Sequence, residues 1–127
     1  MNPLRIFLVD DNPIFLNSAA TFLSAQPHIK IVGLAHSAIQ ALEQLPYLIP
    51  DVVLMDISMP GMNGLKAITR IKRQNLARRV ILVTIHDDCE HRLSAAEAGA
   101  DGYIVKDNFL DSIESLLGLP AIAATLN

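Results

Sequence analysis

Short apolar runs alternate along the chain with segments in which apolar residues recur at helical spacing. The runs are rich in β-branched residues and cover positions 6–9, 29–32, 52–55, 80–83 and 103–105. Most are apolar at consecutive positions, which is typical of strands buried on both faces of a parallel sheet. The pattern therefore predicts five strands.

The segments between and after these runs predict five helices, because their apolar residues repeat every three or four positions. The repeating residues are Phe15, Ala19, Phe22 and Leu23; Ala38, Ala41, Leu42 and Leu45; Leu65, Ile68 and Ile71; Leu93 and Ala96; and Phe109, Ile113, Leu116 and Leu117. Strands that alternate with helices favour right-handed crossovers. We therefore expect an α/β fold with a doubly wound, five-stranded parallel sheet.

Composition narrows the class of protein. The chain has 127 residues, of which 51% are hydrophobic and 18% charged, so it fits one globular domain and neither a disordered chain nor a coiled coil. The apolar runs are too short to cross a bilayer, and no signal peptide is visible. The single cysteine and the net charge of −3 favour a cytoplasmic protein without bulk nucleic-acid binding. We expect a domain over residues 1–117 and a tail or linker stub over 118–127.

Polar residues with complementary chemistry follow four of the predicted strands. They are Asp10 and Asp11 after the first strand, Asp56 after the third, Thr84 after the fourth and Lys106 after the fifth. Ligand sites of open α/β sheets lie at this carboxyl edge. Converging carboxylates repel one another unless a hard cation such as Mg²⁺ shares the site. A hydroxyl and an ammonium there suit phosphoryl oxygens, so the set predicts a site for phosphoryl chemistry.

The same residues carry a family resemblance. Over residues 4–117 the chain resembles the receiver domain of two-component response regulators, of the NarL/FixJ type. The resemblance rests on segments 8–13, 50–56, 59–64 and 98–103 together with Thr84 and Lys106. It implies a flavodoxin-like fold and a phosphorylation-controlled signalling switch that is not a turnover enzyme.

The resemblance also implies roles for the acidic residues. Asp56 is expected to take a phosphoryl group from a histidine kinase. Asp11 and Asp56 are expected to bind Mg²⁺ directly, with the backbone carbonyl of Ser58, and Asp10 through a water. Such a transfer needs positioning and charge neutralisation, and a carboxylate nucleophile is already ionised at neutral pH.

Three further residues complete the implied switch. Lys106 is expected to pair with the phosphoryl oxygens and Thr84 to move toward one of them, while Tyr103 changes its burial. The residue after Thr84 is usually small in this family, and here it is Ile85. We predict that Ile85 restricts access, so that Ile85→Ala is phosphorylated faster by acetyl phosphate.

The partners implied are a sensor histidine kinase or phosphotransfer domain, and a downstream output protein or missing output domain. A second copy of the chain, in a homodimer, is a further candidate partner. One alternative is the N-terminal receiver portion of a DNA-binding transcriptional regulator. Another is a Mg²⁺-dependent aspartyl-phosphate phosphatase, but Ser58 stands where such enzymes carry a second acid. A flavin binder is disfavoured because Asp10 and Asp11 would repel the flavin phosphate.

Three segments allow a second interpretation. His86, Cys89 and His91 have the residue types of a transition-metal site, although we favour a polar loop. The third helix is basic and could contact an acidic partner, although a solvated face is favoured. The first helix carries no charge, and we place Leu16 and Ala20 beside its buried stripe, on a surface that could dock a partner.

Overall fold

The computed structural model describes residues 2–57 and 63–117. The strands are β1 (Leu4–Val9), β2 (Ile29–Ala35), β3 (Val52–Asp56), β4 (Arg79–Thr84) and β5 (Gly102–Val105). The helices are α1 (Pro13–Ser24), α2 (Ala38–Leu48), α3 (Gly64–Arg73), α4 (Cys89–Ala98) and α5 (Phe109–Leu117), with a 3-10 turn at Lys106–Asn108. All five expected strands and all five expected helices are present.

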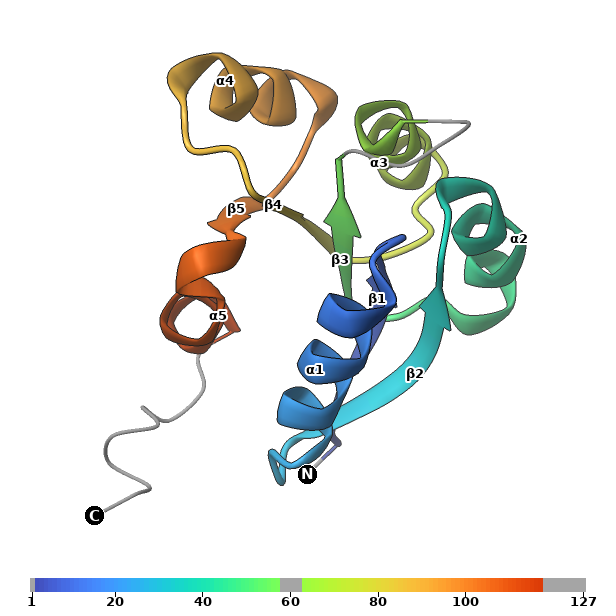
Figure 1. The fold of residues 1–127 in the computed structure, drawn as a ribbon. Coiled ribbons are helices and arrows are strands. Elements are labelled where there is room, and N and C mark those ends of the chain that lie inside the picture. The colour runs from blue at the N-terminus through green and yellow to red at the C-terminus, as the bar shows by residue number, and fades with distance from the viewer. Residues whose placement is uncertain (1, 58–62, 118–127) are drawn as a thin grey trace.

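The strands form one parallel sheet in the order β2-β1-β3-β4-β5. α1 and α5 cover one face of the sheet and α2, α3 and α4 cover the other (Figure 1). The three central strands, β1, β3 and β4, are buried along nearly their whole length. Burial on both faces explains why their apolar residues are consecutive. The doubly wound fold predicted from the sequence is confirmed.

Local signals fix where several helices begin and end. The side chain of Asn12 accepts hydrogen bonds from the backbone N–H groups of Ile14 and Phe15, and Pro13 takes the first position of α1. Gly99, at φ 101°, ends α4 in the left-handed region that favours glycine. The carboxyl end of β1 is thereby followed by a capped helix, and α4 ends in a turn that leads into β5.

Two helix faces differ from the prediction. Leu16 is 1% exposed and belongs, with Ala19 and Leu23, to the core under α1, so it cannot form a docking surface. In α4 the buried residue is Ala95, while Leu93 is 63% exposed. The buried side of α4 is made of small residues, and Thr69 Oγ1 of α3 donates a hydrogen bond to the carbonyl of Ala98 there.

None of the helices in the described part of the chain is both long and apolar enough to cross a bilayer. The expected tail at 118–127 lies outside the described residues.

Candidate functional site

Three carboxylates meet at the carboxyl edge of the sheet. Asp10 follows β1 and Asp56 ends β3, and these strands are neighbours, so the fold brings both side chains to one point. Asp10 and Asp56 are buried, whereas Asp11 is exposed to solvent. One oxygen of each carboxylate lies within 4.8 Å of the other two. The convergence predicted from the strand ends is therefore found.

Lys106 lies among these carboxylates. Its Nζ is 2.7 Å from Oδ2 of Asp10 and 4.0 Å from Oδ2 of Asp56. Within the described chain no other hydrogen-bond donor reaches the buried Oδ2 of Asp10, while its Oδ1 accepts the backbone N–H of Asn12 at 2.8 Å. The ammonium thus neutralises part of the acidic cluster and lies within short reach of a group attached to Asp56.

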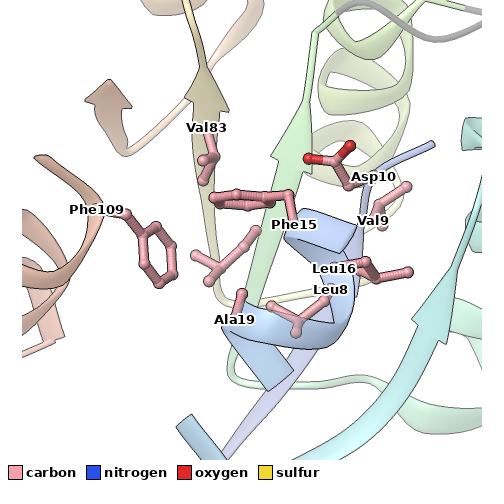
Figure 2. A pocket seen from close by; sticks show the side chains of 9 residues that line it. Leu8, Val9, Asp10, Phe15, Leu16, Ala19, Val83 and Phe109 are labelled. Atoms are coloured by element: carbon pink, nitrogen blue, oxygen red, sulfur yellow. The ribbon is translucent and has the colours of Figure 1, made fainter. Parts of the chain in front are cut away.

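An aromatic ring from α1 contributes to the same site. Nζ of Lys106 lies 4.5 Å from the ring centroid of Phe15, within the range of a cation–π interaction. The ring of Phe15 in turn meets that of Phe109, edge to face, with centroids 5.3 Å apart. Figure 2 shows both rings lining an apolar pocket together with Asp10. The sequence placed Phe15 only in a buried stripe, and no spacing rule indicated its contact with Lys106.

Thr84 and Tyr103 are both linked to the backbone of one residue in the loop that follows β4. The N–H of His86 donates to Oγ1 of Thr84 at 3.2 Å, and its carbonyl accepts the phenol of Tyr103 at 2.6 Å. Thr84 is buried at the end of β4, and Tyr103 lies on the neighbouring strand β5. The two residues expected to act together are therefore joined through His86.

The phenol of Tyr103 lies among groups that shift its pKa in opposite directions. Burial raises the pKa of its phenol above the ordinary value, and the charges of Asp88 and Asp87 act in the same direction. The guanidinium of Arg92 lies over the ring, 4.5 Å from its centroid, and opposes that shift. The phenol is a neutral hydrogen-bond donor at neutral pH.

The carboxylates fit the needs of Mg²⁺. Octahedral coordination at about 2.1 Å places oxygens about 3 Å apart when they are adjacent and about 4.2 Å apart when they are opposite. Oxygens within 4.8 Å of one another need little movement to meet such an ion. All three donors are oxygens, the ligand type that Mg²⁺ prefers.

A glycine allows the backbone to pack closely beside Asp56. A Cβ on Gly64 would collide with the carbonyl oxygen of Asp56. The backbone N–H of Gly64 donates a hydrogen bond to the carbonyl of Ile57 at 3.2 Å. Ser58, the expected backbone ligand, lies outside the described residues. Ile85, directly after β4, is 69% exposed. Its expected restriction of the access of acetyl phosphate to Asp56 stays a prediction.

Comparison with known proteins decides the family. Residues 6–117 match the response regulator receiver domain family. The chain belongs to this family. The receiver domain is 35% identical over 105 residues to the nitrate/nitrite response regulator protein NarL of Escherichia coli K12, a match that covers 83% of this chain and 49% of that protein.

Two further relatives agree. The receiver domain is 36% identical over 114 residues to the transcriptional regulatory protein MctR of Rhizobium johnstonii, covering 90% of this chain and 53% of that protein. It superposes with a TM-score of 0.80 and 31% identity on the receiver domain of the putative response regulator NarL from Mycobacterium tuberculosis, covering 84% of this chain and 86% of that one. The chain spans about half the length of the curated relatives it matches.

Proposed function

We propose that this receiver domain is the phosphoacceptor switch of a two-component phosphorelay, with Asp56 as the residue that takes the phosphoryl group. The observation that carries the proposal is the buried carboxylate of Asp56 at the carboxyl end of β3, with two further carboxylates beside it and Nζ of Lys106 at 4.0 Å. Family membership supports a signalling role of this general kind.

The transfer itself requires little covalent chemistry from the protein. An oxygen of the Asp56 carboxylate forms a bond to phosphorus while the phosphorus–nitrogen bond of a phosphohistidine breaks. The electron pair of that bond stays on the imidazole, which then takes a proton. No residue is needed to deprotonate Asp56, because a carboxylate is ionised at neutral pH. The work of the site is to position the two reactants and to neutralise the charge on the phosphoryl oxygens.

The residues around Asp56 divide that task. Lys106 moves from Asp10 toward the phosphoryl oxygens. The displacement is short, because its Nζ already lies 4.0 Å from Oδ2 of Asp56. Asp11 and Asp56 would hold Mg²⁺ directly, together with the carbonyl of Ser58, which lies outside the described residues, and Asp10 would hold it through a water. The ion, when bound, neutralises charge on the phosphoryl oxygens.

The switch follows from the contacts of His86. In the structure, Oγ1 of Thr84 accepts a hydrogen bond from the backbone N–H of His86 at 3.2 Å. When Thr84 turns toward a phosphoryl oxygen, this hydrogen bond breaks. Because the carbonyl of His86 accepts the phenol of Tyr103, this change reaches Tyr103 through a single residue. The phosphoryl group then acts as a ligand that favours one of two conformations. We infer that the output appears on the face made by α4, β5 and α5.

The partners follow from the same proposal. A sensor histidine kinase or phosphotransfer domain supplies the phosphoryl group, and we infer that the output is transcriptional control. That inference is supported by relatives such as MctR, which is a transcriptional regulatory protein. We further propose that the domain assists its own phosphorylation and dephosphorylation and does not turn over a separate substrate.

The test is incubation with acetyl phosphate and Mg²⁺ followed by intact-mass measurement. We expect one phosphoryl group on the wild type, none on Asp56→Asn, and unchanged labelling of Asp87→Asn, which alters an exposed aspartate outside the site. Labelling should also disappear when EDTA removes Mg²⁺. Full labelling of Asp56→Asn would contradict the proposal, as would no labelling of the wild type with either acetyl phosphate or a phosphorylated kinase domain.

A further inference from the structure

A second cluster of ligand-type side chains lies outside the acidic site, at the start of α4. One donor atom each from His86, Asp88 and His91 lies within 4.8 Å of the other two. His86 belongs to the loop after β4, Asp88 caps α4, and His91 lies in its first turn. Cys89, which the sequence pattern suggested as a ligand, is not part of this cluster.

The cluster is held together by contacts that already join its members. Nδ1 of His91 lies 2.7 Å and 2.8 Å from the two carboxylate oxygens of Asp88, and the backbone N–H of His91 donates to the same carboxylate. The imidazole rings of His86 and His91 are stacked, with centroids 4.2 Å apart and planes within 6° of parallel. Two imidazoles and a carboxylate thus meet on a stretch of six residues.

The donor types differ from those of the acidic site. Imidazole nitrogens bind Zn²⁺ and its neighbours in the first transition series, whereas Mg²⁺ takes oxygen ligands. Two histidines and one carboxylate are a common set for Zn²⁺, with a fourth position filled by water. We propose that His86, Asp88 and His91 form a binding site for a divalent transition metal of the Zn²⁺ class.

Two side-chain movements separate the present arrangement from such a site. Tetrahedral Zn²⁺ with bonds of about 2.0 Å places its donors about 3.3 Å apart, so Nδ1 of His91 and an oxygen of Asp88 must separate by roughly half an ångström. The ion then takes the place of the proton shared by these two groups. The ring of His86 must turn out of the stack, because a metal lies in the plane of each imidazole that binds it. Both histidines are half-buried and Asp88 is exposed, so side-chain rotation is not blocked by the core.

The position of the site gives it a consequence for the switch, and this step rests on the proposed function. The backbone of His86 is bonded to Thr84 on one side and to Tyr103 on the other. A metal that ties the side chain of His86 to the start of α4 stiffens this loop in its present conformation. Because Thr84 must leave His86 to reach a phosphoryl group, bound metal is expected to slow phosphorylation of Asp56.

The site is tested by titrating the purified chain with Zn²⁺ in excess Mg²⁺, against a chromophoric chelator. We expect one Zn²⁺ per wild-type chain and affinity at least about tenfold weaker in His86→Ala and in His91→Ala. His28→Ala, which removes an exposed histidine elsewhere, and Asp11→Asn, which alters the acidic site, should bind Zn²⁺ as the wild type does. Melting temperatures without metal show whether each variant is folded.

Two results would overturn the site. One is wild-type affinity in folded His86→Ala and His91→Ala, and the other is loss of binding in Asp11→Asn, which would place the ion among Asp10, Asp11 and Asp56. The coupling is tested separately with acetyl phosphate. Zn²⁺ should slow labelling of the wild type but not of His91→Ala, and equal slowing of both would overturn it. If the wild type is labelled neither by acetyl phosphate nor by a phosphorylated kinase domain, the proposed function fails, while the Zn²⁺ titration still decides the site.

Discussion

At the scale of single residues, the most informative side chain is Lys106. It lies between Asp10 and Asp56, and the ring of Phe15 covers its ammonium. A cation–π contact of this kind contributes about 0.5–2 kcal/mol, depending on how far it is removed from water. Phe15 is therefore a positioning residue, since it acts on the reacting atoms only through Lys106.

Phe15→Leu tests this role. Leucine keeps an apolar side chain of similar size but removes the ring that faces the ammonium. We expect the phosphorylation rate with acetyl phosphate to fall by roughly twofold to thirtyfold, the range set by a cation–π contact of about 0.5–2 kcal/mol. Phe22→Leu is the matched control, because Phe22 packs against the same core from the same helix. Equal rates in Phe15→Leu and Phe22→Leu would show that the ring does not position Lys106.

Tyr103 makes a prediction about alkaline pH. Its pKa is raised in the folded protein, chiefly by burial, so the folded state holds the phenolic proton more tightly than the unfolded chain does. Its contribution to stability is complete below the ordinary pKa of about 10 and is lost as pH rises through the higher folded value. We expect the free energy of unfolding to fall above about pH 10, and to fall less in Tyr103→Phe. Identical pH profiles from urea titrations would contradict this account.

At the scale of elements, the approach of α3 to the end of β3 is the tightest constraint near Asp56. Gly64, the first residue of α3, leaves no room for a Cβ against the carbonyl of Asp56. That contact explains why the helix begins with glycine, a residue that helices otherwise disfavour.

Gly64→Ala should therefore shift the backbone that carries Asp56. Overpacking of this kind costs about 1–3 kcal/mol, and we expect urea titration to show such a loss together with slower phosphorylation. Gly102→Ala is the control, because the nearest atoms to a Cβ there are in the side chains of Ile81 and Leu116, at an ordinary contact distance of 3.4 Å. Wild-type stability and rate in Gly64→Ala would refute the constraint.

The surface of α1 offers a test of kinase recognition. Ile14 is 78% exposed in the first turn of the helix, and Asn17, Ser18 and Thr21 continue an uncharged surface along it. Ile14→Glu adds a charge to that surface without touching the core, and an acid in the first turn suits the helix dipole.

We expect Ile14→Glu to slow phosphotransfer from a phosphorylated histidine kinase domain by about tenfold, as loss of an anchor of about 1.4 kcal/mol would. Labelling by acetyl phosphate should stay unchanged. Tyr47→Glu, on the opposite layer in α2, is the control. Unchanged phosphotransfer in Ile14→Glu would remove α1 from the docking surface.

The helices also show where sequence reasoning reaches its limit. The strands could be predicted because runs such as Val80–Val83 are short, rich in β-branched residues and apolar at consecutive positions, as a strand buried on both faces requires. In α1 the predicted stripe is buried at Ala19 and Leu23, but Leu16 is buried more deeply than Phe15. The sequence does not distinguish these two, because both are apolar and no charged residue marks the solvent side of the helix. The helix α4 could be predicted but its buried face could not, because its burial rests on Ala95, whose small side chain carries little periodic signal.

At the scale of the whole molecule, strand order places the chemistry. The order β2-β1-β3-β4-β5 makes β1 and β3 neighbours and puts β4 and β5 next to them, so residues far apart in sequence meet at one edge. This part of the site could be predicted, because Asp10, Asp56, Thr84 and Lys106 all follow apolar runs. The contacts of Phe15 with Lys106, and of Tyr103 with His86, depend on how the helices and loops pack against the sheet. No pattern in the sequence encodes those contacts directly.

Chemical trapping identifies the phosphorylated residue, which we propose is Asp56. Borohydride reduces the acyl phosphate of an aspartate to homoserine, which peptide mass spectrometry locates. After reaction with acetyl phosphate and Mg²⁺, we expect homoserine at position 56 and aspartate at positions 10 and 11. Homoserine at either of those positions, with aspartate intact at 56, would contradict it.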